Sequence, residues 1–97
     1  MSVTMITRLH AAPERGDDLA GLLVTGRDRM RAAEGCESFQ LLRDESDARS
    51  FVFLQRWTSH EAHDAAFVEH IVQTGHLDKV LAAIDTEIGQ SSYQVTP

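Results

Sequence analysis

Cysteine, basic residues and long apolar runs are all scarce in this 97-residue sequence. The single cysteine, Cys36, cannot form an intramolecular disulfide, so nothing points to an oxidising compartment. No apolar run approaches the roughly 20 residues that span a bilayer. The first ten residues, MSVTMITRLH, also lack the basic start and apolar run of a signal peptide. We therefore expect a cytoplasmic protein without a membrane partner.

The shortage of basic residues argues against a nucleic-acid partner. Nine lysines and arginines face 15 acidic residues, which gives a formal charge of −6, and the basic residues form no dense cluster. A hydrophobic content of 42% and a charged content of 25% are typical of a globular protein. We expect one domain over residues 1–97, and oligomerisation would help so short a chain to bury enough surface.

The hydrophobic pattern predicts four strands and three helical segments. A helix over about 13–33 would begin near Pro13, and a second would begin where Thr58 and Glu61 have capping-box spacing. After a break at Thr74-Gly75, a last helix would carry apolar residues at helical spacing: Leu77, Val80, Leu81, Ile84 and Ile88. The strands are expected at residues 2–11, 36–43, 50–57 and 91–96. The order β-α-β-β-α(α)-β predicts a ferredoxin-like α+β fold with an antiparallel sheet and helices on one face.

The strand at 50–57 is apolar on both of its faces. Phe51, Phe53 and Trp57 alternate with Val52 and Leu54. A sheet with helices on one face only should be polar on its other face. We therefore expect a homodimer in which two such sheets pack against each other.

The chain resembles the antibiotic-biosynthesis monooxygenase family. The resemblance rests on GCESFQLLRD at 35–44, FVFLQRW at 51–57 and a helix opening SHEAHDA, and it covers almost the whole chain. It implies a dimeric α+β barrel with a ligand pocket between the sheet and the helices. Some members oxidise aromatic anthrones to quinones with molecular oxygen and neither metal nor flavin. Others act on quinols or on small signalling molecules, and one branch binds and degrades haem.

The haem-degrading branch has a sharper pattern, which this chain matches in part. Its strand Asn corresponds to Thr7, and this sequence contains no Asn at all. Its helix Trp corresponds to Ala66 or Phe67, and many non-haem members of the family carry a His at the position of Ala66. Its iron ligand corresponds to His76, so the resemblance keeps the ligand type but neither the amide nor the indole.

Four of the five histidines lie between residues 60 and 76. His63, Phe67 and His70 have the spacing of one helix face. Imidazole exchanges protons around neutral pH and suits the deprotonation that cofactor-free oxygenation requires. His60, His63 and Asp64 are too few for a stable zinc site, and HEAH is one residue shorter than HExxH, so we expect no metal.

We expect a cofactor-independent monooxygenase that acts on an aromatic, quinol-like or polyketide-derived molecule. Thr7 either binds a ligand oxygen or is satisfied by the backbone, and Trp57 either packs in the core or lines the pocket. The alternatives are a haem-binding or haem-degrading protein with His76 as the axial ligand, and a non-enzymatic carrier of a small ligand. The expected site consists of two candidate bases, His70 and His76, and four binding residues, Thr7, His63, Phe67 and Trp57.

Overall fold

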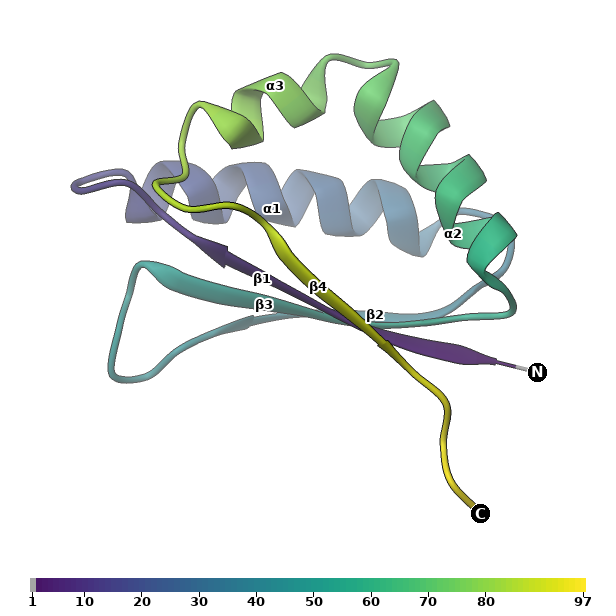
Figure 1. Ribbon diagram of the computed structural model, residues 1–97. Coiled ribbons are helices and arrows are strands. Elements are labelled where there is room, and N and C mark those ends of the chain that lie inside the picture. Colours follow the sequence, from purple (N-terminus) through teal and green to yellow (C-terminus); the bar gives the residue numbers. More distant parts are fainter. Residues whose placement is uncertain (1) are drawn as a thin grey trace.

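The protein is a four-stranded antiparallel sheet with all its helices on one face (Figure 1). The computed structural model describes residues 2–97. The elements, in chain order, are β1 (Val3–His10), α1 (Gly16–Arg31), β2 (Cys36–Arg43), β3 (Ser50–Trp57), α2 (His60–Phe67), the π-helix η1 (Val68–Val72), α3 (His76–Leu81) and β4 (Gly89–Tyr93). This arrangement is the ferredoxin-like α+β fold that the sequence predicts.

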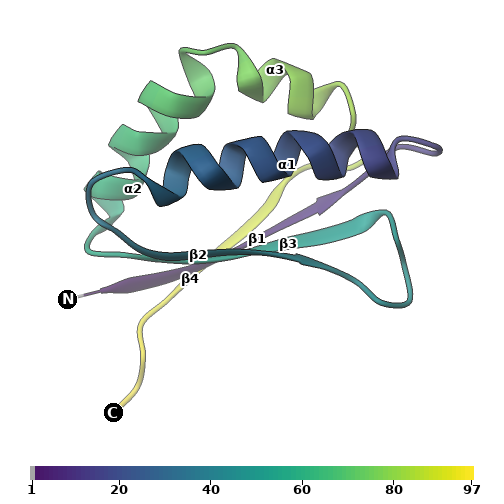
Figure 2. The same cartoon turned by 180° about the vertical axis from the view of Figure 1, so that it is seen from behind.

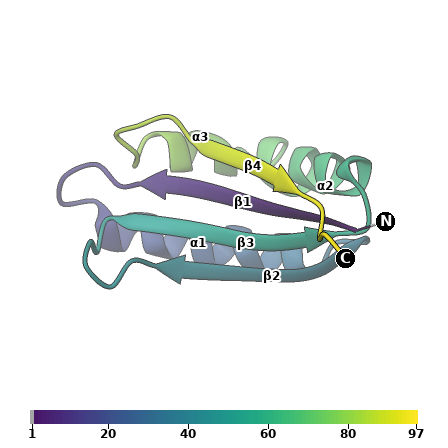
Figure 3. The same cartoon turned by 60° about the horizontal axis from the view of Figure 1, so that its bottom comes forward.

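The strand order in the sheet is β2-β3-β1-β4, so the first and third strands lie at its centre (Figure 3). Val3 pairs with Trp57 and Leu9 with Phe51, which places the inward side chains of β1 and β3 in the same rows. β4 pairs with the other edge of β1. In residues 2–97, no helix is both long and apolar enough to cross a membrane.

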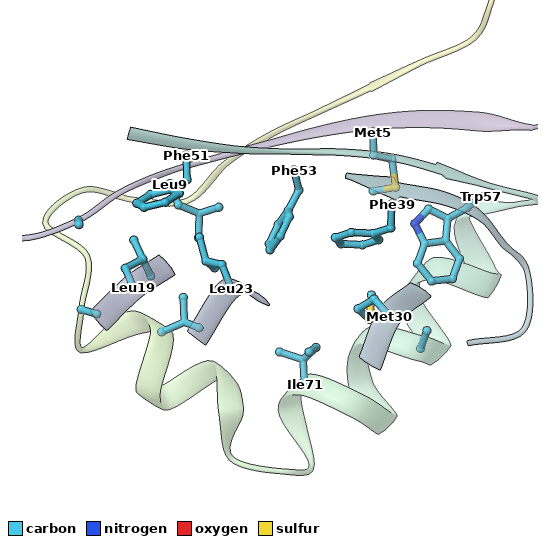
Figure 4. Close-up of a cluster of buried hydrophobic side chains, with 14 of the residues drawn as sticks. Met5, Leu9, Leu19, Leu23, Met30, Phe39, Phe51, Phe53, Trp57 and Ile71 are labelled. Atoms are coloured by element: carbon cyan, nitrogen blue, oxygen red, sulfur yellow. The ribbon is translucent and has the colours of Figure 1, made fainter. Parts of the chain in front are cut away.

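The helices form two parallel segments over the inner face of the sheet. α1 lies over β2 and β3, whereas α2, η1 and α3 follow one another over β1 and β4 (Figures 2 and 3). Buried side chains from both layers meet between them, and Phe53 and Ile71 point toward each other from the sheet and from η1 (Figure 4). The core is closed at one end by Trp57, whose side chain has no exposed surface.

The first helix begins three residues later than Pro13. Glu14 has φ 66°, a left-handed conformation that helical residues do not adopt, and the Arg15 N–H closes a turn on the Ala12 carbonyl at 2.9 Å. The helix therefore starts at Gly16.

The second helix is capped by Ser59 and not by Thr58. The Thr58 N–H still bonds to the Gly35 carbonyl at 2.9 Å, so Thr58 continues the backbone pairing of the strand end and does not begin the helix. Ser59 is extended, and its hydroxyl accepts the N–H of Ala62 at 3.1 Å.

The last helix is shorter than its apolar spacing indicates. It ends at Leu81, because backbone groups beyond it pair with the end of β1: Ala12 N–H donates to the Ala83 carbonyl, and Ile84 forms a bridge with Ala11. Ile88 lies just before β4, which begins at Gly89 and not at residue 91.

The outer face of the sheet is apolar at its centre and carries no helix. Ile6, Val52 and Leu54 alternate with the inward residues and remain only partly buried. Leu42 and Tyr93, on the two edge strands, are 47% and 48% exposed. A single copy of the chain therefore leaves an apolar surface open to solvent on this face.

Candidate functional site

An apolar cavity of about 100 Å³ lies between the sheet and both helical segments. Among its lining residues Leu22, Phe67 and Ile88 are partly exposed, Gln90 is exposed, and the others are buried. Most of the wall is hydrocarbon or glycine: Leu9, Leu22, Leu23, Gly26, Met30, Phe39, Phe53, Phe67, Ile71, Val80 and Ile88. Five polar side chains interrupt it, namely Thr7, Gln55 and Gln90 on the sheet and His63 and His76 on the helices.

The polar residues on the sheet form an amide network with Trp57. The Trp57 indole N–H donates to Gln55 Oε1 at 2.8 Å, and Gln55 Nε2 donates to Thr7 Oγ1 at 3.0 Å. Thr7 and Gln90 face each other across β1 and β4, with 3.4 Å between Oγ1 and Oε1. Thr7 thus lines the cavity and is bonded to side chains, whereas Trp57 lies behind the wall and supports Gln55.

His63 projects from α2 into the cavity wall and is 6% exposed. Its Nδ1 lies 2.9 Å from the carboxylate of Asp64. Because a carboxylate only accepts, Nδ1 carries the proton and Nε2 of the neutral ring keeps its lone pair. The ring stacks on Phe67 at a centroid distance of 6.0 Å and meets the edge of Trp57 at 5.5 Å. This packing fixes the ring plane.

His76 begins α3 and lines the cavity from the same helical segment as His63. Its Nε2 lies 2.8 Å from the carbonyl oxygen of Leu22 on α1. Since a carbonyl also only accepts, Nε2 is the protonated nitrogen. Gly26, one turn further along α1, lies against the ring, and a Cβ there would meet Nε2 at 3.5 Å, an ordinary van der Waals distance.

His70 does not reach the cavity. It is partly exposed on η1 and borders a shallow surface depression with Ala66. The Gln73 N–H bonds to the Val68 carbonyl at 2.9 Å, so this turn holds one residue more than an α-helical turn. The extra residue brings Ile71 to the inward position that α-helical spacing from His63 assigns to His70.

Sequence reasoning missed two polar residues of the site, Gln55 and Gln90, and the contact that a third, Asp64, makes with His63. Gln55 breaks the inward apolar row of β3, and that exception was a readable signal. Gln90 lies opposite Thr7 only because β4 begins earlier than its pattern indicates. Asp64 follows His63 directly on an exposed helix face, where acidic residues are ordinary, so its contact with Nδ1 has no sequence signature.

The residues present do not fit a haem bound through His76. The nitrogen that an axial histidine offers, Nε2, already donates to the carbonyl oxygen of Leu22. A metal held by side chains lacks a ligand set as well: in the described part of the chain, no group of three or more His, Cys, Asp or Glu residues is placed to hold a metal ion. His60 is exposed at the first turn of α2.

Several solved structures share the fold of this chain. Rv0793 from Mycobacterium tuberculosis has a TM-score of 0.87 at 20% identity, with 100% of this chain and 97% of that chain covered. A protein described as an antibiotic biosynthesis monooxygenase has a TM-score of 0.89 at 22% identity, with 98% and 99% covered. A mutant of SnoaB, a cofactor-independent oxygenase from Streptomyces nogalater, has a TM-score of 0.81 at 17% identity, with 99% and 94% covered. At these identities the likeness shows the shared fold.

The sequence itself gives the assignment. No curated protein matches it significantly. The sequence model of the antibiotic biosynthesis monooxygenase family, however, matches residues 2–76, which include β1, the amide network as far as Trp57 and both cavity histidines. The chain therefore belongs to the antibiotic biosynthesis monooxygenase family.

Proposed function

We propose that this protein is a cofactor-independent monooxygenase that oxidises a small electron-rich phenol or hydroquinone with molecular oxygen. One observation carries the proposal: His63, with Nδ1 bonded to Asp64 and Nε2 free to accept a proton, lines an apolar cavity. Membership of the family and the cofactor-independent oxygenase among similar structures support it.

His63 acts as the base in this proposal. Its Nε2 takes the proton of a phenolic hydroxyl, and the imidazolium that forms is stabilised by Asp64. The phenolate transfers one electron to O₂, and the aryloxyl radical and superoxide combine at a ring carbon. For a hydroquinone, loss of water from the resulting peroxide gives a hydroxyquinone. One oxygen atom enters the product and the other leaves as water, so all four electrons come from the substrate.

The cavity volume favours a substrate with a single ring. An apolar cavity of about 150 Å³ holds benzene, and this one measures about 100 Å³. Because this cavity is the smaller of the two, one ring overfills it slightly and displaces the partly exposed Leu22 or Ile88. A polycyclic substrate would have to extend past Gln90 into solvent.

We also propose that the protein is a homodimer joined through the outer faces of two sheets. The apolar centre of that face, Ile6, Val52 and Leu54, has no cover in a single chain, and Leu42 and Tyr93 extend it to both edges. Burying these side chains against a second copy would remove them from water.

Oxygen uptake by chelator-treated protein tests the activity. Hydroquinone, methylhydroquinone and 1,8-dihydroxyanthrone would be compared, each against its rate of autoxidation without protein. We expect uptake with the single-ring quinols, a loss of roughly 10²–10⁴-fold in His63→Gln, and little change in His70→Gln, a matched substitution outside the cavity. Uptake with none of the three would contradict the proposal and favour a ligand carrier.

A further inference from the structure

The amide network has a fixed direction, because its innermost member can only donate. The Trp57 indole N–H has no lone pair to offer, so the Gln55 atom 2.8 Å away must be the carbonyl oxygen. The amide nitrogen of Gln55 consequently faces Thr7 and the cavity. A glutamine without such a neighbour can turn its amide over, and this one cannot do so without losing the indole bond.

One hydrogen of the Gln55 amide remains unused. The NH₂ group has two, and Thr7 Oγ1 accepts one of them. The second has no protein acceptor among residues 2–97, although the side chain is only 3% exposed and borders the cavity. A buried donor without an acceptor is costly, so an oxygen supplied by a ligand at this point gains the full bond.

We propose that Gln55 binds an acceptor oxygen of the ligand through this remaining N–H, and that Trp57 is a positioning residue which holds the amide in the donating orientation. The inference rests on the proposed function for the kind of ligand and deepens it. The sheet wall then offers a donor at Gln55 while the helical wall offers an acceptor at His63 Nε2. A ring that bears two oxygens, as a hydroquinone does, satisfies both walls at once.

Binding of phenol and toluene tests the inference without any turnover. The two molecules have the same shape and differ by one hydroxyl. Their dissociation constants would be measured under argon at pH 7 by NMR titration of backbone amides. We expect Gln55→Leu to weaken phenol binding about tenfold relative to toluene, the size of one hydrogen bond. Gln73→Leu, a matched change at an exposed position after η1, should leave the ratio unchanged.

Two further variants separate ligand binding from a merely structural role. Gln55→Glu keeps an acceptor for the indole but has no amide N–H, so the single indole N–H resonance should persist while any preference for anisole, whose oxygen can only accept, over its isostere ethylbenzene disappears. Trp57→Phe keeps the amide but releases its oxygen, so the preference should fall by a smaller factor. Thermal unfolding of each variant would establish that it is folded.

The outcomes for the inference and for the proposed function are distinct. A phenol preference that depends on Gln55, without oxygen uptake from any quinol, would uphold the binding role and overturn the monooxygenase. Quinol turnover that persists in Gln55→Leu with an unchanged phenol-to-toluene ratio would uphold the monooxygenase and overturn the binding role of Gln55. Failure of wild-type protein to bind phenol more tightly than Gln55→Leu does would overturn the inference.

Discussion

The imidazole of His76 is tied to the backbone of Leu22, with 2.8 Å between Nε2 and the carbonyl oxygen. The bond joins α3 to α1 across the cavity and fixes which ring nitrogen carries the proton. A histidine at the position where the haem-degrading branch has its iron ligand is thus used here to hold two helices together. The ligand type survives in the sequence while the ligating atom is occupied.

Replacing His76 should therefore affect stability and not haem binding. We expect His76→Ala to lower the free energy of unfolding by about 2 kcal/mol, since it removes a buried hydrogen bond and leaves a void. His70→Ala should lower it by less than about 0.5 kcal/mol. Haemin titration should give the same Soret band in wild type and His76→Ala, and a band shift that depends on His76 would contradict this geometry.

A second histidine, His10 at the end of β1, links three segments of the chain. His10 Nδ1 lies 2.8 Å from Asp85 and Nε2 3.1 Å from Asp47, and Arg49 also bonds to Asp85 at 2.9 Å. The hydrogen bond to Asp85, then that to Asp47, raises the pKa of His10 above 6.5. The hydrogen bond from His10 lowers the pKa of Asp85 below 3.8. The pKa of Asp47 is also lowered, first by the hydrogen bond from the backbone N–H of Arg49 and then by the bond from His10.

The stability contributed by His10 should disappear at alkaline pH. Because the folded protein holds this proton more tightly, the contribution is complete below pH 6.5 and is lost as the pH rises through the raised folded value. The aspartates act oppositely: their contribution is complete above pH 3.8 and is lost as the pH falls through their lowered values. We expect His10→Gln to lower the melting temperature most near about pH 5 and hardly at all near about pH 9. His60→Gln, at an exposed site, should show no such dependence, and a pH-independent effect of His10→Gln would count against the cluster.

The cap of α2 can be assigned by comparing two adjacent hydroxyls. Ser59→Ala should cost about 1 kcal/mol, since it leaves the Ala62 N–H without its acceptor. In a chain of this length that corresponds to a fall of roughly 4–8 °C in the melting temperature. Thr58→Ala should have a smaller effect, and the reverse order in calorimetry would show that the helix starts one residue earlier.

The proposed dimer predicts that one acidic substitution on the outer face yields monomers. Leu54 lies at the centre of that face, where a glutamate in a dimer would be buried without a partner. Leu54→Glu should therefore halve the mass measured by light scattering, while its exposed side chain in the monomer leaves the far-ultraviolet circular dichroism unchanged. Glu61→Leu, on α2, serves as a surface control, and an unchanged mass for Leu54→Glu would contradict the interface.

The sheet was predictable because its signals are local. The alternation of Phe51, Phe53 and Trp57 with Val52 and Leu54 predicts both the strand and its two faces, and the structure confirms them. Element ends were less predictable, since Thr58 and Ile84 are held by backbone bonds to Gly35 and to β1 that no local pattern encodes.

The site was predictable in location but not in detail. Of the candidate residues named from the sequence, His63, Phe67, His76 and Thr7 line one cavity between sheet and helices, and that they form a functional site stays a prediction. The hydrogen-bond partner of each imidazole nitrogen could not be predicted from the sequence, because it depends on tertiary packing. Gln55 is the exception, since a single amide in an apolar row can be read from the sequence alone.

Because of the π-helical turn at Val68–Val72, the number of residues in that turn decides which side chain faces the cavity. Removing Val72, which follows His70, would restore ordinary winding and carry His70 inward in place of Ile71. A hydrocarbon surface would become a proton-exchanging one without any change of residue type. Relatives that differ here by one insertion or deletion would then share nearly every residue and still present different chemistry to the same ligand.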